Sequence, residues 1–390
     1  MNTAGPVTLD KPTAWPALVD RAGRRYPGDR PRWCGDDGSP LTVAKRPGIT
    51  RADIDPGIPS QWRYAAALGM PGLAPVTLGE GRTPLLPRRL AGLDVAVKME
   101  AQNPTSSFKD RGSSVMLSVL RAQGVTSLLE DSSGNGGSSV AAYCAAAGIH
   151  AQILAPATTS PAKLLQSRFH GAEVELWSGT RQDTADEALR RAGERFYASH
   201  NWQPHFLEGI KLIAYEIWED LGFTAPTAVV MPAGAGSLVL GCAQGFDELY
   251  RAGEIASPPR LLVSQPARCS PLVRAFAAGH DHVEPTQWHS TLAEGTAITR
   301  PVRDQEVLAA VRSGGGAMTA VDEADLGPAV LALARTGLYT EPTSAQVVPA
   351  LAQFLAAGHL RPDDDVVVIL TGSGHKAAAT MAGLLDSNSR

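Results

Sequence analysis

From about Lys98 onward, short apolar runs alternate with longer amphipathic stretches along the chain. The apolar runs have the length of buried strands, and they lie near residues 127, 151, 172, 228, 260 and 366. The stretches with helical spacing of apolar residues are 111–123, 136–147, 181–197, 208–221, 322–335 and 343–356. Strands that alternate with helices are typical of βαβ units, in which a parallel sheet is covered by helices. We therefore predict an α/β protein with two three-layer α/β/α domains and mainly parallel sheets.

The first 80 residues follow a different pattern. They contain 11 of the 29 prolines and show little helical periodicity, which indicates an irregular extension. Residues 21–41 are rich in turns, as in a small zinc ribbon, but Cys34 is the one thiol in this segment. Because a structural zinc site needs four ligands, a single thiolate cannot build it. We predict that the protein binds no metal.

The overall composition excludes several classes of protein. The 390 residues include 35 Lys+Arg and 39 Asp+Glu, a net charge of -4, which argues against nucleic acid or an anionic membrane as the main partner. The first 16 residues lack the apolar core of a signal peptide, and the longest nearly apolar stretch, 228–243, is too short to span a bilayer. The four cysteines are widely dispersed, as in a reducing cytoplasm. We expect a cytoplasmic enzyme that acts on a small molecule.

Three turns between a predicted strand and a predicted helix are rich in Gly and Ser. They are SSGNGGSS (132–139), PAGAGSLVLG (232–241) and LTGSGHK (370–376). Such turns expose backbone N–H groups at a helix N-terminus, where they can bind a carboxylate or a phosphate. Asn135 adds a side-chain amide to the first turn, and Thr371 stands at the end of the last strand. Taken alone, the first turn is explained equally well as a capped βα connection, and the third is explained better as a helix cap. The second is a single glycine loop, which alone is weak evidence for a phosphate site.

Lys109 lies in the segment NPTSSFKDRG (103–112), at the start of a predicted amphipathic helix. A permanent cation is unfavourable there, because the helix dipole favours anions at the N-terminus. The position suits a lysine that spends its time as a neutral amine or bonded to a carbonyl carbon, although an ordinary surface lysine fits the local pattern too. A lysine, an asparagine loop, a glycine loop and a strand-end hydroxyl are together the parts of a pyridoxal phosphate site.

The segment 103–112 resembles the active-site lysine motif of threonine synthases, in the tryptophan synthase β-like family (fold type II) of pyridoxal phosphate enzymes. The resemblance covers roughly residues 75–385 in the family's order. It continues through LGEGRTPLL (78–86), SSGNGGSSVAAYCAAAG (132–148), FLEGIKLIAYEI (206–217), MPAGAGSL (231–238), GLYTEPTSA (337–345) and LTGSGHK (370–376).

The resemblance implies roles for residues of this chain. Lys109 becomes the Schiff-base lysine and proton shuttle, with Phe108 beside it. Asn135 contacts the ring hydroxyl of the cofactor, and Thr371 bonds the pyridine nitrogen. A neutral hydroxyl does not keep that nitrogen protonated, which suits elimination and replacement at the β or γ carbon rather than transamination. The cofactor phosphate is held by Gly234, Ala235, Gly236 and Ser237. The substrate carboxylate is received by Ser133, Gly134, Gly136, Gly137 and Ser138.

Two positions depart from the threonine synthase pattern. Many of those enzymes have Thr where this chain has Gly136. They also carry, directly before LEG, an Arg that helps to bind the phosphate of the substrate, and this chain has Phe206 there. An aromatic ring cannot supply the bidentate donors that a phosphate dianion prefers. The departure weakens phosphohomoserine as the substrate. The cations considered as substitutes are His200, His205, Lys211 and Arg268.

We expect an N-terminal extension with a decayed zinc-ribbon-like segment (1–74), a large cofactor-binding domain (75–111 and 206–390) and a small α/β domain (112–205). The expected activity is that of a threonine synthase-like lyase, with threonine formation from O-phosphohomoserine as the family's usual reaction. The alternative is β-elimination or β-replacement on Ser, Thr, a diamino acid or an activated serine, as in a dehydratase, an ammonia-lyase or a cysteate synthase. A binding protein without activity is a further alternative. The resemblance also implies a homodimer.

Overall fold

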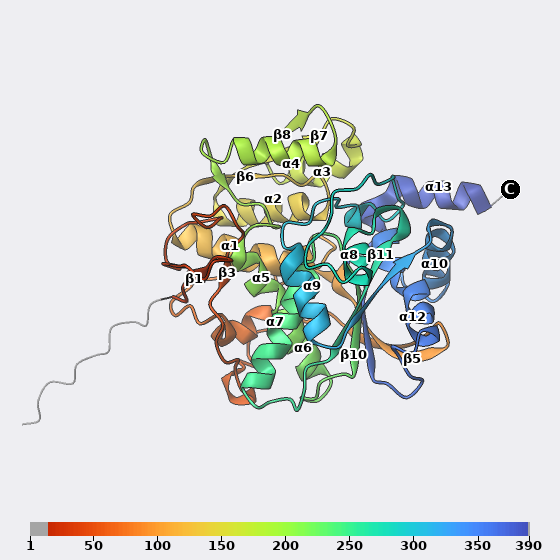
Figure 1. Cartoon of the computed structure of the whole chain (residues 1–390). Coiled ribbons are helices and arrows are strands. Elements are labelled where there is room, and N and C mark those ends of the chain that lie inside the picture. The colour runs from red at the N-terminus through yellow and green to blue at the C-terminus, as the bar shows by residue number, and fades with distance from the viewer. Residues whose placement is uncertain (1–14, 389–390) are drawn as a thin grey trace, which may run out of the picture.

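The computed structural model describes residues 15–388, and within this range the strands form three sheets (Figure 1). The smaller of the two parallel sheets has the strand order β8-β7-β6-β9, with every pair parallel. Its strands are β6 (Ser127–Glu130), β7 (His150–Pro156), β8 (Glu173–Trp177) and β9 (Phe196–Tyr197). Residues 127–197 therefore supply the whole of this sheet.

The larger sheet has the order β12-β11-β10-β13-β5-β4. Its strands are β4 (Leu85–Leu90), β5 (Leu93–Lys98), β10 (Ala228–Pro232), β11 (Arg260–Pro266), β12 (Ala317–Val321) and β13 (Val366–Ile369). All neighbours are parallel except β4 and β5, which form an antiparallel hairpin at one edge. The predicted α/β class with mainly parallel sheets is confirmed.

Helices cover these sheets on both faces (Figure 1). The α-helices are α1 (Lys109–Ala122), α2 (Asn135–Ala147), α3 (Pro161–Phe169), α4 (Arg181–Arg190), α5 (Pro204–Ile210), α6 (Leu212–Asp220), α7 (Ser237–Arg251), α8 (Pro271–Ala277), α9 (Asp304–Ser313), α10 (Glu323–Arg335), α11 (Pro342–Ala345), α12 (Val347–Ala356) and α13 (Ala378–Asn388). Short 3-10 helices lie at Arg51–Asp53, Gln61–Leu68, Glu100–Gln102, Ala267–Cys269, Glu294–Thr296 and Gly374–Ala377.

The strand β10 shows how the larger sheet separates two cores. Val229 and Met231 belong to a cluster that includes residues of α1, α6 and α7, whereas Ala228 and Val230 belong to a cluster with residues of α10 and α12. Successive side chains of a strand point to opposite faces, so a strand that is buried on both faces is a continuous apolar run. The smaller sheet is divided in the same way, with Leu128 packed in the cluster of α2 and Leu129 in the cluster of α4. Each sheet is therefore the middle of three layers.

The N-terminal extension contains more structure than its proline content predicts. Three short strands, β1 (Leu18–Val19), β2 (Arg25–Tyr26) and β3 (Thr42–Val43), form an antiparallel sheet in the order β2-β1-β3. Arg21 ties this sheet to the body of the protein, since its Nε lies 2.8 Å from Glu306. Within residues 15–388, no group of three or more His, Cys, Asp or Glu side chains is placed to hold a metal ion.

Three predicted helices differ from the periodicity: one ends early, and two, 208–221 and 343–356, are each divided in two, the latter into α11 and α12 at Gln346. The stretch 181–197 is helical only to Arg190, because Phe196 and Tyr197 pair as a strand with Leu128 and Leu129. The stretch 208–221 is divided into α5 and α6 at Lys211. Helix periodicity does not record tertiary pairing, so the early end of the first helix follows from a contact that the sequence pattern omits.

No helix within residues 15–388 is long and apolar enough to cross a membrane. Residues 1–14, which hold most of the segment inspected for a signal peptide, lie outside the described range. The domain boundaries at 74, 111 and 205 remain a proposal. In their favour, the smaller sheet lies wholly within residues 112–205.

Candidate active site

A cavity of about 300 Å³ lies where the turns that follow strands of both sheets come together. The turn after β6 contributes Asn135, the turn after β10 contributes Gly236, and the turn after β13 contributes Thr371. Lys109 and Glu341 also line the cavity. The three Gly- and Ser-rich turns and the predicted lysine therefore meet at one place, as expected where parallel strands end.

Lys109 is the first residue of α1, and its amine lies over aromatic rings. Nζ is 4.6 Å from the centre of the Phe108 ring and 5.7 Å from the centre of the Phe206 ring. Burial lowers the pKa of Lys109 to about 8, and the carboxylates of Glu130 and Glu341 oppose this shift. Near neutral pH a useful fraction of the amine is therefore unprotonated and able to attack a carbonyl carbon.

The first turn of α1 is fixed by buried ionic groups. Arg111 is fully buried, and its Nη2 lies 2.6 Å from Glu100 and 2.8 Å from Glu216. The backbone N–H of Phe108 donates to the carbonyl oxygen of Thr371 at 3.0 Å. These contacts hold the backbone of Lys109 beside the end of β13. The point from which the lysine side chain extends into the cavity is therefore fixed.

The turn before α7 has no room for side chains at two of its glycines. Gly236 has a φ of 90°, and a Cβ there would lie 2.2 Å from Cγ2 of Val307. A Cβ on Gly234 would lie 2.9 Å from the carbonyl oxygen of Gly295. The turn therefore presents bare backbone at the N-terminus of a 15-residue helix that starts at Ser237. This is a cradle of the kind that binds a phosphate.

The turn before α2 is equally tight. A Cβ on Gly136 would lie 2.5 Å from Cε1 of His200, and a Cβ on Gly137 would lie 1.8 Å from the carbonyl oxygen of Ser132. A threonine at position 136, as in many threonine synthases, does not fit while His200 occupies this place. The departure at Gly136 is thus explained by a neighbouring side chain.

The predicted substrate-binding residues of this turn divide into two groups. Ser133, Gly134 and Gly136 line the cavity, whereas Gly137 and Ser138 are not part of its lining. Ser138 Oγ instead accepts a hydrogen bond from Nζ of Lys376 at 2.7 Å. The structure therefore brings the first part of the turn to the cavity and places the rest behind it.

At the end of β13, Thr371 is buried and its hydroxyl lies 2.8 Å from the hydroxyl of Ser344. Ser344 belongs to α11, and its Oγ also accepts from the backbone N–H of Gly372 at 2.9 Å. The hydroxyl of Thr371 is thus held by a neutral hydroxyl, and neither of these hydrogen bonds involves a carboxylate.

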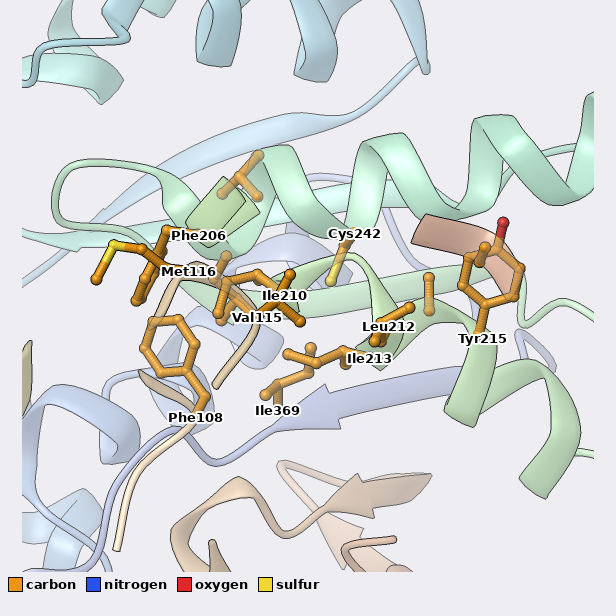
Figure 2. Close-up of a cluster of buried hydrophobic side chains, with 14 of the residues drawn as sticks. Phe108, Val115, Met116, Phe206, Ile210, Leu212, Ile213, Tyr215, Cys242 and Ile369 are labelled. Carbon is orange, nitrogen blue, oxygen red and sulfur yellow. The ribbon is translucent and has the colours of Figure 1, made fainter. Parts of the chain in front are cut away.

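Phe206 does not line the cavity. Its side chain is fully buried, and Figure 2 shows it at one end of an apolar cluster with Phe108, Val115 and Met116. A Cβ on Gly112 would lie 2.5 Å from the Phe206 ring, so α1 packs directly on this ring. Phe206 therefore lies beneath Lys109, which was not expected from its predicted role as part of the substrate pocket.

The structure shows the surroundings of all four cations considered as substitutes for the missing arginine. His200 lines the cavity, but its Nδ1 lies 2.9 Å from Glu130, and burial holds its pKa well below the usual value. Burial lowers the pKa of His205 to about 4. Lys211 Nζ is paired with Glu208 at 2.7 Å and with Glu248 at 2.8 Å. Arg268 is not part of the cavity lining. None of the four presents a free cation to the cavity.

Other charged residues at the cavity were missed by the sequence analysis: Lys163, Arg181, Glu294, Glu341 and Lys376. Glu341 stands in the quoted segment GLYTEPTSA, and its buried position has raised its pKa to about 7. Lys163 and Arg181 belong to α3 and α4, where nothing in the helical pattern distinguishes them from surface residues. Lys163 pairs with Glu294, and Arg181 Nη1 lies 3.0 Å from Asp131.

Comparisons with known proteins agree with this geometry. Residues 76–372 match the family described as pyridoxal-phosphate dependent enzyme. The threonine synthase of Methanosarcina acetivorans is 34% identical over 324 residues, which cover 80% of this chain and 79% of that protein. The threonine synthase of Methanocaldococcus jannaschii is also 34% identical, with 81% and 80% covered.

Solved structures show the same fold at lower identity. A fungal L-serine ammonia-lyase from Rhizomucor miehei superposes with a TM-score of 0.68 at 20% identity, covering 78% of this chain and 98% of that chain. Diaminopropionate ammonia lyase from Escherichia coli gives a TM-score of 0.67 at 16% identity, covering 80% and 89%.

The chain belongs to the family of pyridoxal-phosphate dependent enzymes. Within this family of fold type II it is a lyase of the threonine synthase type. The cavity fits the cofactor, because a lysine with a lowered pKa faces bare backbone that can bind a phosphate.

Proposed function

We propose that Lys109 carries pyridoxal phosphate covalently and moves the proton at the α carbon of an amino-acid substrate. The observation that carries this proposal is the position of its amine, at the cavity, over the Phe108 ring and with a pKa of about 8. An amine with this pKa serves both as nucleophile toward a carbonyl carbon and as acid and base near neutral pH.

The remaining cofactor contacts are assigned to the turns. The backbone N–H groups of the turn before α7 close around the cofactor phosphate, and the Thr371 hydroxyl faces the pyridine nitrogen. Asn135 reaches the ring hydroxyl from the start of α2. The phosphate turn consists of Gly234, Ala235, Gly236 and Ser237, all of which line the cavity.

The substrate is held through its carboxylate. Ser133, Gly134 and Gly136 line the cavity at the N-terminus of α2, a 13-residue helix whose free N–H groups favour an anion. Gly137 and Ser138 support this turn from behind. Phe206 supports Lys109 from below and is assigned no contact with the substrate.

The reaction that these residues serve is elimination or replacement at the β or γ carbon. When bound, the cofactor supplies an electron sink next to the α carbon. Lys109 Nζ takes the α proton and returns it later, and the buried walls exclude water while the leaving group departs. The neutral Thr371–Ser344 hydroxyl pair does not favour a protonated pyridine nitrogen, which disfavours transamination.

We further propose that phosphohomoserine is a weaker substrate here than in dedicated threonine synthases. Among the described cavity residues, Lys163 and Arg181 already have acidic partners, and Nζ of Lys376 donates to Ser138 and Gln166. Phe206, at the arginine position, lies outside the cavity and supplies no cation there. Each missing charge-assisted hydrogen bond is worth roughly 1.5–3 kcal/mol, which is about tenfold to a hundredfold in affinity.

The test is kcat/KM for phosphohomoserine, phosphoserine, serine and threonine with the loaded enzyme. We expect the uncharged amino acids, or an uncharged activated derivative, to react more efficiently than the phosphorylated ones. Efficient and specific turnover of phosphohomoserine would contradict the specificity, and no turnover or spectral change with any amino acid would contradict the assigned chemistry.

The proposal extends to the state of the protein in the cell. We propose a cytoplasmic homodimer, in keeping with the four free cysteines of the described residues and with the resemblance to threonine synthases. Light scattering on the purified protein gives the oligomeric state directly.

A further inference from the structure

A second cavity, of about 410 Å³, adjoins the first. The two share Arg181, Asn201, Ala297 and Ile298 in their linings. The second cavity lies between α4, the segment that follows β9, and residues 297–302. It is therefore placed to continue the substrate pocket away from Lys109.

The charged residues that line the second cavity are paired with one another. Arg181 Nη1 lies 3.0 Å from Asp131, and Arg300 Nη2 lies 2.6 Å from Asp186. Burial opposes the ionisation of Asp131, but the neighbouring Arg181 outweighs it, and the pKa of Asp131 lies below its usual value. A phosphate dianion in this cavity would meet an ionised carboxylate and no unpaired cation among the described lining residues.

The remaining walls combine apolar surface with polar atoms. Tyr197 and Ser199 are fully buried, and the Ser199 hydroxyl interacts with both Asp131 and Tyr197. Even so, Tyr197 Oη, Ser199 Oγ and Asn201 Oδ1 form no well-aligned hydrogen bond within the described residues. A buried polar atom whose hydrogen bonding is incomplete is unfavourable, so such atoms favour a guest that hydrogen-bonds to them. The apolar part of the lining comes from Ala185, Leu189, Trp202, Ile298 and Val302.

The N-terminal extension supports this wall from outside. The Trp33 ring lies 5.2 Å from the Tyr197 ring and 5.3 Å from the Trp202 ring, edge to face in both cases. The extension therefore packs against two aromatic side chains that line the second cavity.

We propose that the second cavity receives the distal end of the amino-acid substrate, and that this end is uncharged, with an apolar body and a hydrogen-bonding group such as an ester or an amide. The inference rests on the proposed function, because the reacting carbon must lie at Lys109. It adds the chemical class of the side chain to that proposal.

The experiment measures the binding of three probes to the cofactor-loaded enzyme by the change in its absorption spectrum. The probes are L-homoserine, O-acetyl-L-homoserine and O-phospho-L-homoserine. Two variants change the second cavity: Ala185→Leu narrows it by adding three carbon atoms to one wall, and Tyr197→Phe removes one hydroxyl at nearly constant volume. Ala192→Leu is the matched control, since Ala192 is partly buried beside α4 and outside the lining.

In the wild type we expect O-acetyl-L-homoserine to bind about tenfold more tightly than the other two probes. Ala185→Leu removes this preference, Tyr197→Phe reduces it several-fold without lowering the Tm, and Ala192→Leu leaves it in place. Tightest binding of the phosphorylated probe, or a preference unchanged in Ala185→Leu, would overturn the inference. If the spectrum of the loaded enzyme responds to serine and threonine but the acetyl group does not tighten binding, the inference is overturned and the proposed function stands. An enzyme that responds to no amino acid overturns the proposed function as well.

Discussion

The Glu341 carboxylate accepts a hydrogen bond from Nδ2 of Asn135 at 3.1 Å, and this bond joins the start of α2 to the segment that enters α11. Both residues line the cavity of Lys109. Burial raises the pKa of Glu341 to about 7, although the bond from Asn135 and the lysines Lys376, Lys109 and Lys163 favour its charged form. The amine of Lys109 and the carboxyl group of Glu341 therefore both titrate near neutral pH within one cavity. Each stabilises the charged form of the other.

The first prediction concerns the effect of Glu341 on the amine of Lys109. The neutral amine is the form that reacts with the cofactor, so the rate of cofactor loading of the apoprotein rises with pH, with a midpoint near the pKa of about 8. Glu341 is mostly ionised at this pH and raises the pKa of Lys109. In Glu341→Gln the midpoint therefore moves to lower pH, as stopped-flow absorption at a series of pH values will show.

Asp363→Asn is the control for this shift. Asp363 is exposed in the loop before β13, and its removal should leave the midpoint unchanged. A midpoint that stays in place in Glu341→Gln, or one that moves to higher pH, would show that the carboxylate does not act on Lys109.

The second prediction concerns the glycine cradle before α7. In Gly236→Ala a methyl group would lie 2.2 Å from Val307, so the turn must move and its N–H groups no longer converge. We expect a loss of cofactor affinity of at least tenfold, measured by titration with pyridoxal phosphate. Gly253→Ala is the matched control: its φ is 76° and no atom lies within 4 Å of the added methyl group. Gly253→Ala should lower the free energy of unfolding by only roughly 1–2 kcal/mol, the cost of a left-handed backbone at alanine, and should leave the cofactor affinity unchanged. Equal cofactor affinities in the two variants would show that the turn before α7 does not bind the phosphate.

A third prediction replaces Phe206 by arginine. The guanidinium would be buried beneath Lys109, in the apolar cluster shown in Figure 2. Phe206→Arg should therefore lower the free energy of unfolding by about 3 kcal/mol or more, measured with urea, and should not create phosphohomoserine activity. Phe206→Leu, which keeps the site apolar, should retain most of the stability. A stable arginine variant that gains phosphohomoserine turnover would show that position 206 belongs to the substrate pocket.

Most of the strands that the sequence predicts are buried on both faces, and β8, none of whose residues is buried, is the exception. β10 and β13 are continuous apolar runs, and each was found from this pattern alone. The hairpin of β4 and β5 was missed because β4 contains Pro87 and two arginines, which a strand tolerates only at the edge of a sheet. β9 has only two residues, and its pairing with β6 depends on the tertiary fold.

The candidate site was predicted where local chemistry is unusual. Lys109 at a helix start and the three glycine turns stand out in the sequence, and the fold brings them together. Arg181 and Asp131 do not stand out, because their pairing depends on how α4 packs beside β6. The location of Phe206 was not foreseen either, since one residue of a helix can point into a pocket or into the core with the same sequence.

A fourth prediction is that the protein needs no zinc. Cys34 is paired in a β-bridge with Pro40, and residues 15–388 contain no cluster of side chains suited to a metal ion. Treatment with a strong chelator should leave the Tm unchanged, and elemental analysis should find far less than one zinc per chain. One tightly bound zinc per chain, or unfolding by the chelator, would contradict this prediction.

The central claim is that Lys109, and no other lysine of the cavity, carries the cofactor. Lys163 and Lys376 also line the cavity, so the structure offers real competitors. Borohydride reduction of the loaded enzyme, followed by proteolysis and mass spectrometry of the peptides, shows which lysine bears the pyridoxyl group. We predict the label on Lys109 alone, and no label in Lys109→Ala. A label on Lys163 or Lys376, or an unlabelled lysine 109 in a protein that holds the cofactor, would contradict the account.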